Sequence, residues 1–124
     1  MFKFKYERNN TLLIFTTDES GLCEDVANEV EQEFHALDRS KVHDVIINLT
    51  GVRFIASHFA NWIMLVHLET QRKGGQLIVC SVCEHIIELL ARLHFTSTVV
   101  IVCDELTARL LLLLSDNEKT ASTV

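Results

Sequence analysis

Residues 44–75, DVIINLTGVRFIASHFANWIMLVHLETQRKGG, are the stretch that most restricts how this chain can fold. The stretch opens with a mostly apolar, β-branched run from Val45 to Leu49, which is typical of a strand covered on both faces. Thr50-Gly51 predicts a turn, and the apolar residues that follow recur at helical spacing. Gly74-Gly75 predicts the end of that helix. The unit is therefore a buried strand, an exposed loop and an amphipathic helix.

The N-terminal residues predict an antiparallel pair of strands. Phe2, Phe4 and Tyr6 alternate with charged residues, which is the period of a strand with one solvent face. Asn9-Asn10 predicts a tight turn into a second strand over residues 11–16.

Helical stripes and apolar strands alternate along the rest of the chain: a helix at 26–37, strands at 76–81 and 99–102, and helices at 86–93 and 105–114. This alternation predicts an α/β fold with right-handed crossovers, a mixed but mostly parallel sheet and about four helices. A chain of 124 residues with 48% hydrophobic content suits one core. We expect a single domain over residues 1–114 and a flexible tail over residues 115–124.

Ser57 stands where the predicted loop meets the predicted helix. Its hydroxyl can accept a hydrogen bond from an otherwise unpaired amide of the first helical turn, which makes Ser57 the best N-cap candidate. This structural role is available to a serine at the start of any helix. A second role for Ser57 follows from a resemblance to a known family.

The succession of an apolar strand, LTGVRFIAS, an apolar helix, KGGQLIVCSV and HIIELLARLHF resembles the STAS superfamily, and most of all the bacterial anti-sigma-factor antagonists. The resemblance extends over residues 2–113, so it implies a STAS-like single domain. In those antagonists the loop reads Asp-Ser-Ser-Gly or Asp-Ser-x-Gly, and a kinase that is also the anti-sigma factor phosphorylates the first serine. Here the loop reads Ala56-Ser57-His58-Phe59: the serine is kept, and the aspartate and glycine are replaced. The resemblance implies that Ser57 is the phosphoacceptor.

The same resemblance implies a surface that meets the anti-sigma factor. It is formed by the serine loop, the helix after it and the loop before the first helix, and we assign to it Asp18, Ser20, Gly21, Ser57, His58, Asn61 and Leu65. Leu65 and Leu68 fall on the side of the predicted helix away from its apolar stripe. Such residues indicate either a docking face or contact with a neighbouring helix.

Two functions follow from the resemblance. The first is a non-catalytic interaction switch that binds an anti-sigma factor/serine kinase. The alternative is a STAS accessory subunit of an ABC-type lipid transporter, which does not require a phosphorylatable loop. An enzyme is the third hypothesis and rests on the Cys80-x-x-Cys83 spacing of redox proteins. The chain has no proline, so it lacks the cis-proline of thioredoxin-like sites, and we expect no enzyme.

Composition excludes several classes of partner. A net charge of −6 gives no basic surface for direct nucleic-acid binding. The first residues, MFKFKYERNN, lack a long apolar core and a cleavage site, and no apolar run is long enough to span a membrane, so we expect a cytoplasmic protein. The cysteines are interpreted as free thiols, and the scattered histidines as surface or boundary residues. We expect no metal and no cofactor, and the oligomeric state stays open.

Overall fold

The computed structural model describes residues 1–93 and 99–122, which form four helices and two sheets. The strands are β1 (Phe2–Glu7), β2 (Leu12–Thr17), β3 (Gly21–Leu22), β4 (Asp44–Asn48), β5 (Phe54–Ile55), β6 (Leu77–Cys80) and β7 (Val100–Val102). The helices are α1 (Glu24–Ala36), α2 (Ser57–Arg72), α3 (Glu84–Arg92) and α4 (Glu105–Ser122).

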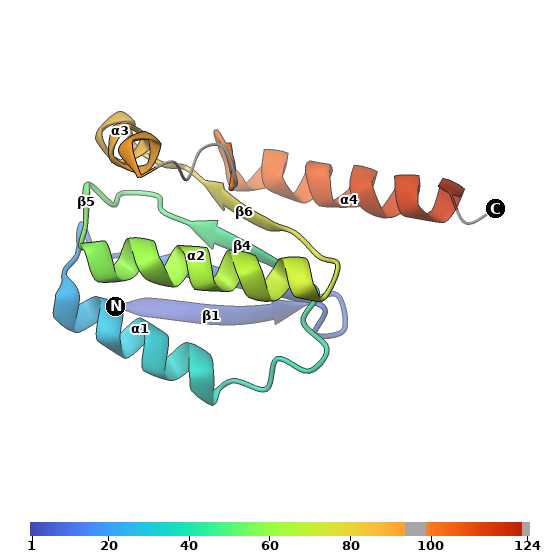
Figure 1. Ribbon diagram of the computed structural model, residues 1–124, viewed down its shortest axis with the longest axis horizontal. Coiled ribbons are helices and arrows are strands. Elements are labelled where there is room, and N and C mark those ends of the chain that lie inside the picture. Colours follow the sequence, from blue (N-terminus) through green and yellow to red (C-terminus); the bar gives the residue numbers. More distant parts are fainter. Residues whose placement is uncertain (94–98, 123–124) are drawn as a thin grey trace.

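The main sheet has five strands in the order β1-β2-β4-β6-β7 (Figure 1). β1 pairs antiparallel with β2, and the other neighbouring strands are parallel. β4 is an inner strand, because Ile46 lies opposite Ile14 on one side and Ile78 on the other. These observations confirm the predicted α/β class, with a mostly parallel sheet and an antiparallel N-terminal strand.

One face of the sheet is covered by α1 and α2 and holds the larger core, here called the front layer (Figure 1). An aromatic cluster lies at its centre, in which the Trp62 ring is 5.3 Å from Phe59, 5.4 Å from Phe34 and 5.7 Å from Phe15. Phe4 of β1 lies 6.1 Å from Trp62. Aromatic pairs in this range contribute about 0.5–1.5 kcal/mol beyond their burial. The cluster therefore fixes α1 and α2 against the first two strands.

The opposite face is covered by α4 and is called the back layer. Ala108 and Leu112 of α4 are buried against a small aliphatic group that includes Ile46 and Ile78. The Arg109 guanidinium donates to both Glu7 carboxylate oxygens at 2.8 Å. This paired contact ties α4 to β1, and it lowers the pKa of Glu7 to about 2.

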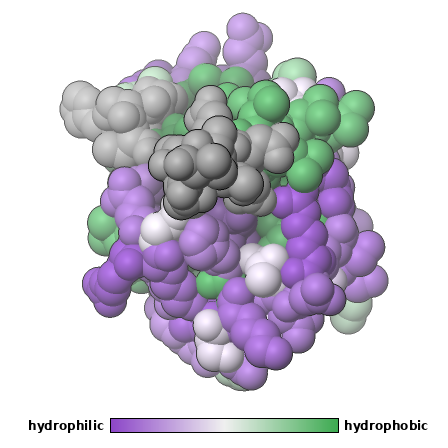
Figure 2. Space-filling model, turned by 90° about the vertical axis from the view of Figure 1, so that its right-hand side faces the viewer, coloured by the Kyte–Doolittle hydropathy of each residue, from purple (hydrophilic) through white to green (hydrophobic). Residues whose placement is uncertain are grey.

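The outer side of α4 carries a stripe of exposed leucines: Leu106, Leu110, Leu113 and Leu114. Figure 2 shows hydrophobic surface gathered in its upper part, at the level of α4, above a mostly polar lower part. Among the described residues, no helix combines the length and the apolar character needed to cross a membrane.

The C-terminal helix is longer than predicted. α4 continues to Ser122, so the expected end of this helix at about Leu114 is wrong. Residues 115–122 contain neither glycine nor proline, and a loss of apolar periodicity alone does not stop a helix. The flexibility expected for residues 115–124 stays a prediction, and residues 123–124 lie outside the described part.

The end of α2 depends on two glycines, as predicted. The helix ends at Arg72, and Gly74 adopts a positive φ of 79°. A Cβ atom on Gly75 would lie 1.6 Å from the backbone oxygen of His43, so the chain returns to the sheet through a contact that only glycine permits.

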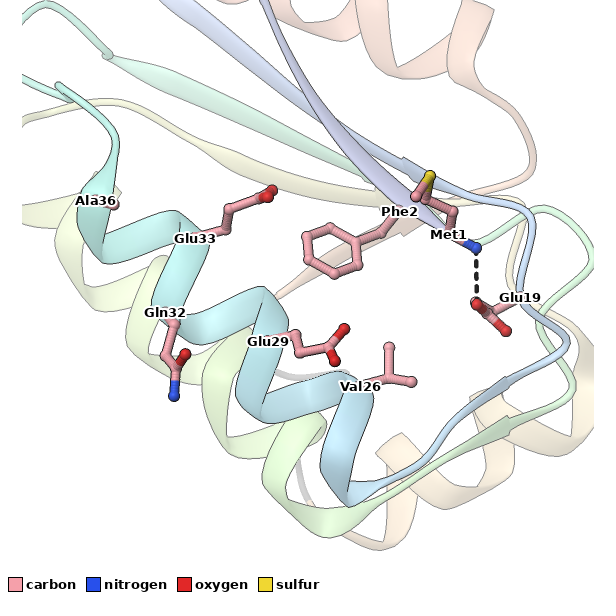
Figure 3. Close-up of a pocket in the computed structure, with 8 residues that line it drawn as sticks. All are labelled: Met1, Phe2, Glu19, Val26, Glu29, Gln32, Glu33 and Ala36. Atoms are coloured by element: carbon pink, nitrogen blue, oxygen red, sulfur yellow. Dashed lines mark hydrogen bonds and ion pairs between the residues drawn. The ribbon is translucent and has the colours of Figure 1, made fainter.

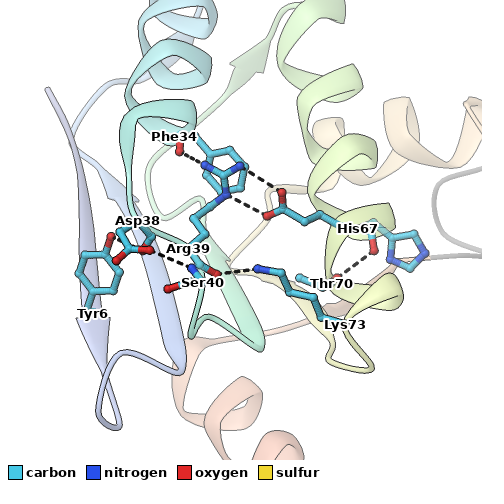
Figure 4. A network of polar contacts seen from close by, with 9 residues as sticks. Tyr6, Phe34, Asp38, Arg39, Ser40, His67, Thr70 and Lys73 are labelled. Carbon is cyan, nitrogen blue, oxygen red and sulfur yellow. Dashed lines mark hydrogen bonds and ion pairs between the residues drawn. The ribbon is translucent and has the colours of Figure 1, made fainter.

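Polar contacts hold the chain between α1 and β4 against α2 (Figure 4). Arg39 donates to the Glu69 carboxylate at 2.9 and 3.1 Å, and its guanidinium carbon lies 4.1 Å from the centre of the Phe34 ring. Lys73 donates to the backbone oxygen of Arg39 at 2.6 Å. The loop after α1 is thus joined to the C-terminal half of α2 by charged contacts.

Candidate functional site

A small second sheet brings together the two loops that the sequence assigned to one surface. β3 and β5 pair in parallel, with Gly21 opposite Phe54 and Leu22 opposite Ile55. The backbone oxygen of Ser20 accepts hydrogen bonds from the amides of Arg53, at 2.7 Å, and Phe54, at 3.3 Å. The loop before α1 is therefore fixed directly beside the segment that leads into α2.

Ser57 is the first residue of α2, and the prediction that it caps the helix is wrong. Ala56 is the N-cap: its backbone is extended, and its oxygen accepts hydrogen bonds from the amides of Phe59, at 3.0 Å, and Ala60, at 3.2 Å. The helix starts one residue earlier than expected because the Ala56 amide is held by the Leu22 oxygen at 2.8 Å. No side chain caps α2.

The position of Ser57 suits a phosphate. Its side chain is exposed, and no hydrogen bond joins its hydroxyl to any residue of the described chain. The first turn of α2 contains no acidic residue. Free amides and the positive end of the helix dipole favour a negative group at such a position.

His58 turns back toward α1. Its Nε2 atom lies 2.5 Å from a carboxylate oxygen of Glu31, and the His35 ring lies 3.7 Å from the same carboxylate. The hydrogen bond with His58 is the main cause that lowers the pKa of Glu31. His58 is half-buried, so it links the serine loop to α1 while still lying at the surface.

The outer face of α2 is a stripe of exposed residues: Ser57, Asn61, Leu65, Leu68 and Arg72. Leu65 is 54% exposed and Leu68 is 48% exposed, so no neighbouring helix covers them. Beside the stripe, α1 and α2 enclose a shallow groove of about 230 Å³ whose lining includes Phe34 and Trp62. The exposed leucines therefore border a hollow with aromatic walls.

The structure brings some of the assigned surface residues close together and leaves others apart. Ser20, Gly21, Ser57 and His58 gather around the small sheet, whereas Asn61 and Leu65 extend from it along α2. Asp18 is exposed further back on its loop, where its carboxylate pairs with the amino group of Met1.

Comparison with known proteins identifies the family. A model of the STAS domain matches residues 3–108. This chain belongs to the STAS domain family. No curated protein is significantly similar to it in sequence.

Solved structures share the fold of this STAS domain. A candidate anti-sigma factor antagonist from Thermotoga maritima is 17% identical, with a TM-score of 0.77 over 90% of this chain and 93% of that one. An anti-sigma-factor antagonist (STAS) domain protein from Planctomyces limnophilus is 19% identical, with a TM-score of 0.77 over 90% and 96%. The anti-sigma factor antagonist SpoIIAA in its unphosphorylated form is 10% identical, with a TM-score of 0.66 over 89% and 94%. Identities this low show a common fold and do not transfer a partner.

Phe54 is a surface residue of the STAS domain that sequence reasoning missed. Its side chain is 54% exposed, and a Cβ atom on Gly21 would lie 3.8 Å from its ring. The sequence placed Phe54 in the exposed loop before the predicted helix and gave its side chain no role. An exposed aromatic ring on the strand that leads into α2 is a feature typical of docking surfaces.

The cysteines and the possible metal ligands are the remaining candidate groups. Burial raises the pKa of the Cys80 thiol to about 11, which disfavours the thiolate that redox chemistry needs. All four cysteines are free thiols. Within residues 1–93 and 99–122, no group of histidine, cysteine or acidic side chains is arranged to hold a metal ion.

The burial of one histidine, His67, differs from the prediction. His67 is buried, so its interpretation as a surface or boundary residue is wrong. It lies one turn after Ile63, on a part of α2 that packs toward the sheet, and α2 is buried around more of its circumference than a single apolar stripe indicates. His94 lies outside the described residues.

Proposed function

We propose that this STAS domain is a non-catalytic interaction switch that binds an anti-sigma factor/serine kinase and is phosphorylated at Ser57. The observation that carries the proposal is the small β3–β5 sheet, which places an exposed, unpaired serine at the start of α2 beside the loop before α1. Structural neighbours described as anti-sigma factor antagonists support the same class of function.

The altered loop does not obstruct this surface. Phe59 stands where the family has a glycine, but its ring is fully buried and packs on Phe15 and Trp62 at 5.8 and 5.3 Å. The substitution therefore adds to the core and leaves the outer face of α2 open. Ala56 lacks the carboxylate of the family's aspartate, and its backbone still starts the helix.

The alternative is a STAS accessory subunit of an ABC-type lipid transporter. It is favoured by the absence of the acidic residue beside Ser57. In that case the outer face of α2 binds a nucleotide-binding subunit, and phosphorylation plays no part.

A kinase assay separates the two functions. We expect the cognate kinase and ATP to add one phosphate to the wild-type chain and none to Ser57→Ala, whereas Ser40→Ala, at an exposed serine of the loop after α1 and outside the assigned surface, accepts phosphate normally. Intact-mass spectrometry measures the result. A chain that binds a transporter ATPase subunit and stays unmodified with every serine kinase of its source contradicts the switch and supports the alternative.

A phosphate mimic tests the switch itself. Ser57→Asp should bind the kinase more weakly than the wild type, because an interface that buries an unpaired charge commonly loses about 2 kcal/mol or more. Its melting temperature should not fall, since a negative group at a helix start is favourable by about 0.3–1 kcal/mol. Unchanged binding of Ser57→Asp would show that charge at this position does not control docking.

A further inference from the structure

An open groove of about 730 Å³ lies between α1 and the edge strand β1, away from the outer face of α2 (Figure 3). Its apolar surface comes from Met1, Phe2, Val26 and Ala36. Phe2 is only partly buried, and its ring lies 6.0 Å from Phe15, so the groove is continuous with the aromatic core. The groove therefore has a firm apolar floor.

The α1 side of the groove carries uncompensated negative charge. Glu29 and Glu33 line it one helical turn apart, and Figure 3 shows both carboxylates reaching from α1 toward the Phe2 ring. Neither forms an ion pair with a described residue, whereas Glu19 at the far end pairs with the amino group of Met1 at 2.7 Å. Like charges at this spacing repel each other, so a cation between them would be stabilising.

Near the C-terminal end of α1, a phenylalanine ring and a carboxylate already bind an arginine side chain of this protein. There, the Arg39 guanidinium lies 4.1 Å from the centre of the Phe34 ring and pairs with Glu69 at 2.9 Å. The groove offers the same two components, a phenylalanine ring and carboxylates, without a guanidinium. A planar guanidinium stacks on an aromatic ring and pairs with a carboxylate at the same time, which an ammonium group does less well.

We infer that this groove binds an arginine side chain of a partner protein, presented on a segment with apolar neighbours. The guanidinium stacks on Phe2 and pairs with Glu29 and Glu33, and the apolar neighbours cover Val26 and Ala36. The site lies away from the outer face of α2 and meets the assigned surface only at the loop of Asp18, which pairs with Met1. It requires neither Ser57 nor its phosphorylation.

Fluorescence polarisation with a labelled synthetic peptide, GLRVRLG, tests this site at low salt. The wild-type chain should bind this peptide and should not bind its citrulline counterpart, which keeps the shape and loses the charge. Glu29→Gln/Glu33→Gln should weaken binding at least about tenfold, because both charge partners are lost. Glu84→Gln/Glu88→Gln, with the same charge change at exposed positions of α3, should stay within about twofold.

Amide chemical shifts locate the bound peptide, and the expected changes fall on Phe2, Val26, Glu29 and Glu33. Three results would each overturn the inference. The citrulline peptide could bind as tightly as the arginine peptide, or the α3 variant could lose as much affinity as Glu29→Gln/Glu33→Gln. The chemical-shift changes could also be confined to other elements. A lysine peptide that binds as tightly would overturn the assignment of a guanidinium. None of these results bears on the kinase assay with Ser57, so the two proposals fail independently.

Discussion

The two faces of the main sheet are covered by layers that are built differently. The front layer has α1 and α2, an aromatic cluster and the Arg39–Glu69 pair between the loop after α1 and α2, and Ile86 and Leu90 of α3 are buried in the same core. The back layer has one helix, a small aliphatic core and the Arg109–Glu7 pair. On the outside, α2 presents two leucines among polar residues, whereas α4 presents four leucines in one stripe.

This contrast teaches that exposed leucine alone does not mark the functional face. The outer face of α2 is fixed in position by the core beneath it, and it adjoins the paired loops that carry Ser20 and Ser57. The stripe on α4 is more apolar, but α4 covers the opposite face of the main sheet from α2. We therefore propose that docking uses the outer face of α2, and the predictions below test each side of the comparison.

The largest effect is expected in the front core. Ile47 is fully buried in β4 on the side of the aromatic cluster. Ile47→Asp places an unpaired charge there and should destabilise the domain by more than about 3 kcal/mol. Chemical denaturation measures this, and a soluble variant with native melting would show that β4 is not an inner strand.

A smaller loss is expected in the back core. Leu112 is the large α4 side chain buried against the sheet, and Leu112→Ala should cost about 2–3 kcal/mol. Leu110→Ala, on the exposed side of the same helix, should change stability by less than about 0.5 kcal/mol. Equal losses in the two variants would mean that α4 is rotated about its axis relative to this structure.

The Arg109–Glu7 pair should make the attachment of α4 depend on pH. The folded-state pKa of Glu7 is about 2, below its ordinary value of 4.5, so the pair stabilises the fold above pH 4.5 and loses this effect as pH falls toward 2. Glu7→Gln should be less stable than the wild type by about 1 kcal/mol at neutral pH, and this difference should shrink over that interval. Melting curves at several pH values measure it, and a constant difference would contradict the assigned cause.

Much of the fold could be predicted because it depends on local pattern. The alternation in β1, the apolar run of β4 and the glycines after α2 each encode one element, and the structure contains all three. The extension of α4 to Ser122 was missed because polar residues end a hydrophobic stripe without ending a helix.

The site was less predictable because it depends on contacts between distant residues. The pairing of Gly21 with Phe54 and the hydrogen bond between His58 and Glu31 join segments that no local pattern connects. The role of Ala56 as N-cap follows from its amide contact with Leu22, which the sequence could not show. The family resemblance indicated which loops meet, and the structure adds how they are held.

The central claim, that the outer face of α2 is the docking surface, is tested most directly by one paired binding measurement. Leu65→Asp and Leu106→Asp make the same change at leucines that are 54% and 67% exposed, on α2 and α4 respectively. Titration calorimetry with the anti-sigma factor/serine kinase should show binding abolished in Leu65→Asp and unchanged in Leu106→Asp, with both variants folded. Loss of binding in Leu106→Asp together with full binding in Leu65→Asp would contradict the account and place the docking surface on α4.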